Sequence, residues 1–103
     1  MENNGSSKPT IEFKVSRTAN VTNVAETLAK MVLRGNNVRL IGVGAGAINQ
    51  MAKAAAAALK DTAPHGIMLR WRVYFKDVPI PEDVPRVEGD RDNWTAVVME
   101  TDS

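Results

Sequence analysis

A strand, a glycine-rich turn and an alanine-rich helix follow one another near the middle of the chain, and this unit constrains the fold most. Residues 38–43 form an almost continuously apolar run, which predicts a central strand of a sheet. Residues 42–46 (Gly-Val-Gly-Ala-Gly) make the turn, and residues 47–60 predict a helix dominated by alanine, the best helix former. Small side chains let a helix approach a sheet closely, so packing is the simplest explanation of the alanines. The unit predicts helices packed on a sheet.

Further strands and a second helix are predicted on either side of this unit. Apolar and polar residues alternate over residues 11–16 and 67–76, the period of a half-buried strand, and residues 94–100 predict a last strand. A helical spacing of apolar residues begins at Val21 and stops at Gly35. The order β-α-β-α-β-β predicts an α+β fold, a two-layer sandwich with a four-stranded mixed sheet. Because the crossovers should be right-handed, both helices are expected on one face, which leaves the other face open.

The length of 103 residues is that of one domain. The polar residues 1–10 predict a flexible tail, and residues 11–103 predict the single domain. The chain has no cysteine and one histidine, His65, which excludes disulfides, thiolate zinc sites and multi-histidine metal sites, and we expect no cofactor. No apolar run approaches the roughly 18 residues of a membrane span, and the first residues are unlike a signal peptide. We therefore expect a cytoplasmic protein without a membrane partner.

The net charge of +1 is distributed unevenly along the chain. Residues 8–76 carry 11 basic and 3 acidic residues, a net charge of +8. Residues 77–103 carry 2 basic and 8 acidic residues, a net charge of −6, and Glu2 completes the balance. The basic part favours an anionic partner, and two solvated surfaces explain the asymmetry equally well. Most of the acidic residues lie in a proline-bearing connection, residues 77–93, which we expect to form a hairpin arm.

The glycine-rich turn allows three interpretations: an anion site, a dinucleotide site and a purely structural turn. Backbone N–H groups at the start of a helix can hold an anion, and this predicts an anion-binding turn at Gly44, Ala45 and Gly46. The turn also fits a permissive dinucleotide-binding pattern, but the chain is too short for a dinucleotide fold and lacks the lysine and hydroxyl pair of a P-loop. A purely structural turn is as well supported as an anion site.

Catalysis is not expected. His65 lies in a loop, and the carboxylates of residues 77–93 lack the rigid spacing that paired acid and base groups need. A basic strand is the remaining signal, since Arg70 and Arg72 alternate with Tyr74 on the side that we expect to face away from the helices. Cations can neutralise phosphates and an aromatic ring can stack on an unpaired base, although ordinary solvent exposure or an oligomer interface would give the same pattern.

Residues 39–54 resemble the stage V sporulation protein S family. The segment from Gly44 to Ala47, followed by Asn49-Gln50 and Lys53-Ala54, is similar to the most specific motif of that family. The family is assigned to the Alba-like superfold, whose element order matches the one predicted above. The resemblance implies a non-enzymatic regulatory or architectural protein that forms homodimers or higher homo-oligomers and binds DNA or RNA. In sporulating bacteria the members of the family act in spore development.

The resemblance also implies where nucleic acid would bind. Alba-like proteins use the loop after the first strand, the start of the second helix and the hairpin arm. The first candidate contacts on the matching segments are Arg17, Asn49, Gln50 and Lys53. The basic strand adds two second candidates, Arg70 and Arg72.

Two features depart from the pattern of such proteins. Gly46 stands where Alba-like proteins tend to carry a basic residue, and the arm of residues 77–93 is acidic and would be repelled by phosphates. Two alternatives therefore stay open. One is a self-assembling structural protein in which basic faces meet acidic arms, and the other is a nucleotide- or anion-binding module at the glycine-rich turn.

Overall fold

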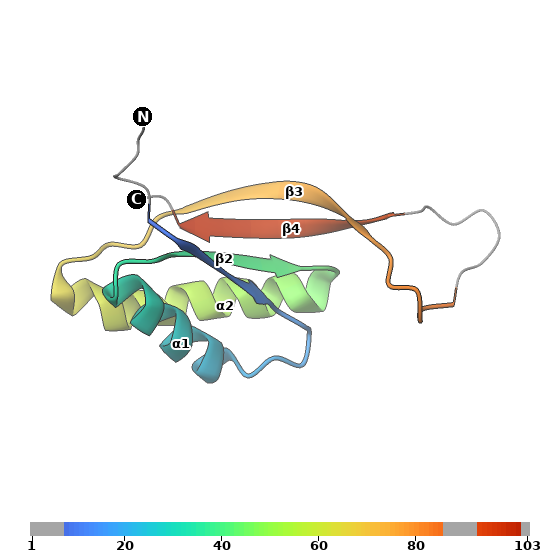
Figure 1. Cartoon of the computed structure of the whole chain (residues 1–103). Helices are drawn as coiled ribbons and strands as arrows, with labels where there is room; N and C mark the ends of the chain where they lie inside the picture. Colours follow the sequence, from blue (N-terminus) through green and yellow to red (C-terminus); the bar gives the residue numbers. More distant parts are fainter. Residues whose placement is uncertain (1–7, 86–92, 102–103) are drawn as a thin grey trace, which may run out of the picture.

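The computed structural model describes residues 8–85 and 93–101, and it places two helices on one face of a four-stranded sheet (Figure 1). The α+β class, the order of the elements and the mixed sheet predicted from the sequence are confirmed. The elements are β1 (Thr10–Lys14), α1 (Val21–Leu33), β2 (Asn37–Gly42), α2 (Ala45–Thr62), a 3₁₀ turn (Ala63–His65), β3 (Trp71–Pro79) and β4 (Asn93–Thr101).

The strands lie in the order β1-β2-β4-β3, with β1 parallel to β2 and with β4 antiparallel to both of its neighbours. The expectation that residues 38–43 form a central strand is confirmed, because β2 lies between β1 and β4. The register aligns one residue of each strand across the whole sheet: Glu12, Arg39, Glu100 and Arg72. Paired residues point to the same side of a sheet, so these four share the face opposite the helices.

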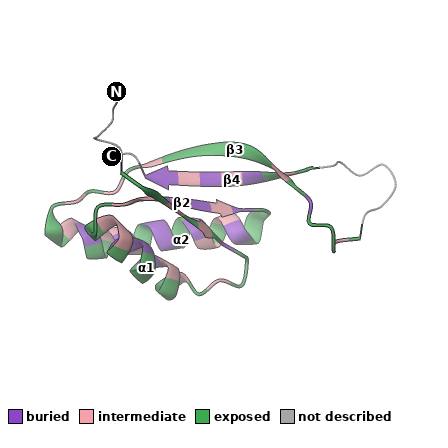
Figure 2. Ribbon diagram, viewed as in Figure 1, coloured by how far each residue is buried: buried purple, intermediate pink, exposed green. Residues whose placement is uncertain are grey.

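The core lies between the helices and the inner face of β2. Val38 and Leu40 of β2 are fully buried there against Leu28 of α1 and Met51 of α2. Complete burial of a side chain such as Leu28 stabilises the fold by about 2 kcal/mol. Figure 2 shows that the buried residues follow β2, β4 and the inner sides of the helices.

The alanines of α2 allow the close packing that the sequence predicts. Their buried members are Ala47, Ala54, Ala55 and Ala58. Gly42, at the end of β2, serves the same close approach, because a Cβ there would lie 2.7 Å from the sulfur of Met51 and 3.0 Å from the carbonyl oxygen of Val15. β2 and α2 can therefore approach this closely only because residue 42 has no side chain.

The prediction of a strand over residues 67–76 is wrong at both ends. The segment after α2 first closes that helix, since the N–H of Ile67 donates to the carbonyl of Thr62 at 3.2 Å, and strand pairing begins only at Trp71. Pairing then continues to Pro79, past the point where the alternation ends. An edge strand tolerates proline because its outer N–H groups need no partner, and β3 is such a strand.

The other predicted boundaries differ by smaller amounts. The first strand ends at Lys14 instead of residue 16, and α2 runs from Ala45 to Thr62 and so takes in the last part of the glycine-rich turn. Because β3 ends at Pro79, the connection to β4 is shorter than residues 77–93. Residues 1–7 of the expected tail lie outside the described residues.

Candidate functional site

A buried carboxylate organises the open face of the sheet. Glu100 is only 8% exposed, and its Oε2 accepts a hydrogen bond from Nε of Arg39 at 2.8 Å and forms an ion pair with a terminal nitrogen of Arg39 at 2.7 Å. Its Oε1 accepts from Arg72. Arg39 also reaches Glu12 at 3.4 Å, so one ionic network connects all four strands.

The network shifts the titration of its central members. Hydrogen bonds from Arg39 lower the pKa of Glu100 below its usual value of 4.5, and they outweigh the burial that would raise it. The same hydrogen bond raises the pKa of Arg39. Glu100 is therefore an anion at neutral pH, and it neutralises part of the basic face.

This arrangement bears on the second candidates from the sequence. Arg72 lies on the face opposite the helices, as expected, with its guanidinium 5.7 Å from the ring centre of Tyr74 and paired with Glu100. Its side chain is still 67% exposed, so some of its five N–H donors face solvent. Arg70 is exposed but precedes β3, so it does not belong to the sheet.

The first candidates gather at the start of α2. Asn49 and Lys53 are exposed and lie four residues apart, which places them on one face of the helix. Gly46 shares this face, and a Cβ there would lie 2.7 Å from the Cβ of Arg17. The loop after β1 therefore crosses the helix at Gly46 and sets the exposed Arg17 at one end of the row. Arg17 thus supplies a positive charge beside Gly46, the position at which Alba-like proteins tend to carry a basic residue.

Gln50 has a different environment from its neighbours. It is half-buried, and its Nε2 donates to the carbonyl of Ala19 at 2.9 Å, which ties α2 to the loop before α1. The Nδ2 of Asn49 lies 3.5 Å from the Oε1 of Gln50, a long contact that leaves Asn49 facing solvent. The structure thus brings Arg17, Asn49 and Lys53 together on an exposed face, and it gives Gln50 a supporting position beneath them.

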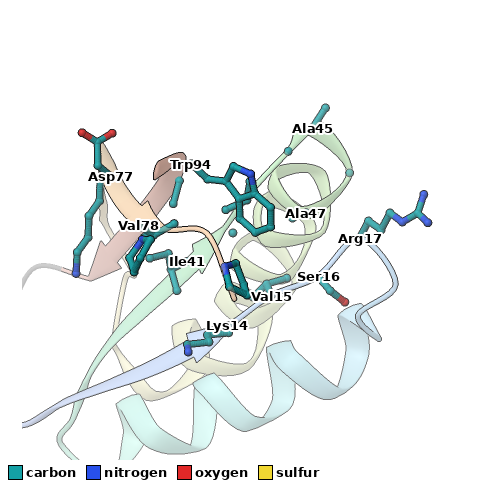
Figure 3. A pocket seen from close by; sticks show the side chains of 18 of the residues that line it. Lys14, Val15, Ser16, Arg17, Ile41, Ala45, Ala47, Asp77, Val78 and Trp94 are labelled. Atoms are coloured by element: carbon teal, nitrogen blue, oxygen red, sulfur yellow. The ribbon is translucent and has the colours of Figure 1, made fainter. Parts of the chain in front are cut away.

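A cavity lies beside the glycine-rich turn. Its volume is about 860 Å³, it is open to solvent, and it is lined by the ends of β1 and β2, by residues 42–46 and by parts of β3 and β4 (Figure 3). Gly44 caps α2 with φ of +90°, a conformation that only glycine adopts readily, and no side chain caps the helix. The first turn of α2 contains no acidic residue, so its free N–H groups leave the positive end of the helix dipole unneutralised.

A family model with the description stage V sporulation protein S matches residues 11–100. The chain belongs to this family. Membership confirms the resemblance seen in the sequence and makes the chain a sporulation-related protein. A search of curated proteins finds no match to it.

In this member of the stage V sporulation protein S family, the acidic arm is described only in part. Glu82 and Asp83 are exposed, whereas Glu88, Asp90 and Asp92 lie outside the described residues. Within residues 8–85 and 93–101, no three histidine or carboxylate side chains gather as a metal site would require. Neither helix in this part of the chain has the length and apolar character of a membrane span.

Sequence reasoning did not find the ionic network or the cavity. Arg39 and Glu12 look like ordinary polar positions until the register shows that Glu12 faces Arg39 and that Arg39 faces Glu100. It also left out Lys60, which is exposed seven residues after Lys53 and extends the same face of α2. Its helical spacing from Lys53 was a signal that could have found it.

Proposed function

We propose that this protein is a non-enzymatic regulatory or architectural factor that binds nucleic acid as an oligomer. The observation that carries the proposal is the exposed row on α2, in which Arg17, Asn49 and Lys53 lie together and Lys60 continues the line. Cations in a row suit a phosphate backbone, and an amide such as that of Asn49 suits a phosphate oxygen or a base edge.

The charges around this row support the assignment. No ion pair joins Arg17, Lys53 or Lys60 to a described carboxylate, whereas Arg39 and Arg72 are paired with Glu100. The unpaired cations of the α2 row are therefore more available to phosphates than those of the open face. We rank the α2 row as the main contact surface and Arg70 and Arg72 as secondary contacts.

A salt titration tests the proposal. The affinity of the whole protein for fluorescently labelled DNA and RNA is measured by anisotropy at several salt concentrations, with Arg17→Gln, Lys53→Gln and the control Lys30→Gln, which removes an exposed lysine from α1. Each lost phosphate contact should reduce the slope of log K against log salt by about 0.7 to 0.9, and the control should leave the slope unchanged. Absence of binding at low salt, or equal slopes in all variants, would contradict the proposal.

Self-association is supported by the exposed side of β3. Val73 and Phe75 share the face of Met99 and Val97, but the helices do not cover them, and they are 62% and 77% exposed. Apolar side chains on an edge strand favour pairing with a second copy of the chain. Phe75→Glu should yield monomers in sedimentation experiments in which the unchanged protein is oligomeric.

The response to salt distinguishes this mode of association from the alternative, in which basic faces meet acidic arms. Association through Val73 and Phe75 should persist as salt rises, since burial of apolar surface is not screened. Association through Glu82 and Asp83 would weaken as salt screens the charges. A salt-sensitive oligomer that binds no nucleic acid would support the structural alternative instead.

A further inference from the structure

The cavity beside the glycine-rich turn combines an apolar interior with an aromatic wall. Val15, Ile41, Val78 and Trp94 gather around its centre in Figure 3. Trp94 is half-buried and pairs across the strands with Val78, which fixes the indole against the cavity. A volume of about 860 Å³ lies within the range of roughly 300–1,000 Å³ that is typical of sites for small organic groups.

Two lysines line this cavity, one on each edge strand of the sheet. Lys14 belongs to β1 and Lys76 to β3, and the register places both on the open face, with β2 and β4 between them. Three strand spacings separate β1 from β3, or roughly 14 Å at the backbone. Neither lysine has an ion pair with a described carboxylate.

The acidic residues at the cavity do not neutralise these cations. Glu12 is turned toward Arg39 at 3.4 Å, and Oδ1 of Asp77 accepts a long hydrogen bond from Thr95 at 3.5 Å. Figure 3 shows the carboxylate of Asp77 and the guanidinium of Arg17 pointing outward from the centre. The cavity therefore offers an apolar, aromatic interior, and the two lysines among its lining residues have no ion pair with a described carboxylate.

We propose that this cavity holds one unpaired nucleotide of a single-stranded nucleic acid, and this rests on the proposed function. The base lies against Trp94, where an aromatic face accepts any base by stacking. Lys14 and Lys76 contact the phosphates on the two sides of that nucleotide. A base held in a duplex cannot enter, because its faces are covered by its neighbours in the stack.

Trp94 supplies its own readout, because the described chain has one other tryptophan, Trp71, which packs against the core. In a Trp71→Phe protein, fluorescence is followed while a short single-stranded oligothymidylate is added at low salt. Parallel titrations use the same strand annealed to its complement, thymidine 5′-monophosphate and thymidine. Anisotropy of a labelled strand reports binding anywhere on the protein.

The single strand should quench the fluorescence of Trp94. The duplex should reach the same quenching only at a concentration at least about tenfold higher, as expected for loss of one stacked base. The monophosphate should bind more weakly than the strand, and thymidine more weakly still. Lys14→Gln and Lys76→Gln should each weaken quenching by about threefold to fivefold, whereas Lys30→Gln should not change it. Trp94→Leu should weaken strand binding by about tenfold while circular dichroism shows the same fold.

Other outcomes would overturn the proposal. The strand could bind, as judged by anisotropy, without quenching Trp94 and without depending on Lys14 or Lys76. That result would exclude the cavity as a binding site and leave the α2 row as the binding surface. Monophosphate binding as tight as strand binding would make the cavity a site for free nucleotides. If neither the single strand nor the duplex binds, as judged by both tryptophan fluorescence and anisotropy, the proposed function fails together with this inference.

Discussion

Replacing Glu100 by glutamine should destabilise the protein by removing the charge at the centre of the open-face network. Glu100 is 8% exposed and its carboxylate accepts from Arg39 and Arg72, and a hydrogen bond to a charged group contributes about 1.5–3 kcal/mol when it is shielded from water. The side chains of Arg39 and Arg72 are 31% and 67% exposed, so solvent screens part of this stabilisation. We expect a loss of about 2 kcal/mol, or about 10 °C in Tm.

The dependence on pH gives the same prediction a second readout. Because the pKa of Glu100 is lowered in the folded state, its contribution is present above the usual value of 4.5 and is lost as the pH falls through the folded pKa. The difference in unfolding free energy between the unchanged protein and Glu100→Gln should therefore be constant near neutral pH and shrink in acid. Urea unfolding at several pH values measures it.

Glu12→Gln is the matched control, because Glu12 contacts the same Arg39 from an exposed position at 3.4 Å. An exposed pair contributes less than about 1 kcal/mol, so this variant should unfold close to the unchanged protein. Equal destabilisation by Glu100→Gln and Glu12→Gln, or a Glu100 effect that does not diminish in acid, would show that the charge of Glu100 does not stabilise the network.

Three further substitutions test the packing by urea unfolding. Thr62→Val should be neutral or stabilising by about 1 kcal/mol, because the buried Thr62 hydroxyl has no hydrogen-bond partner among the described residues. A lower free energy of unfolding in this variant would indicate that the hydroxyl has a partner. Gly42→Ala should cost about 1–3 kcal/mol, since its Cβ would meet Met51, and an unchanged midpoint would contradict the close approach. Asn20→Ala should cost about 1 kcal/mol, because Asn20 caps α1 by accepting from Asn23, and no loss would discount the cap.

The sequence was sufficient for the architecture because each element carried a local signal. The apolar run of β2, the alanines of α2 and the alternation within β3 each depend on residues close together in the chain. The limits of β3 were not predictable in this way. They depend on the hydrogen bond from Ile67 to Thr62 and on the pairing of Pro79 with Asn93, and no local pattern encodes either one.

The site was predictable where its residues follow one helix. The spacing of Asn49 and Lys53 already places them on one face of α2, and the structure adds that Arg17 reaches this face by crossing Gly46. The partners of Glu100 were hidden because Arg39 is 61 residues away in the chain, and only the strand register brings them together. The cavity is likewise a product of tertiary structure, since its walls come from four strands and a turn.

Binding of nucleic acid to the α2 row can be observed residue by residue in backbone amide spectra of the isotope-labelled protein, recorded while a single-stranded oligonucleotide is added at low salt. The largest shifts should occur at Arg17, Asn49 and Lys53, and added salt should reverse them. Spectra without shifts, or with shifts confined to the exposed side of α1 around Lys30, would contradict binding at the α2 row.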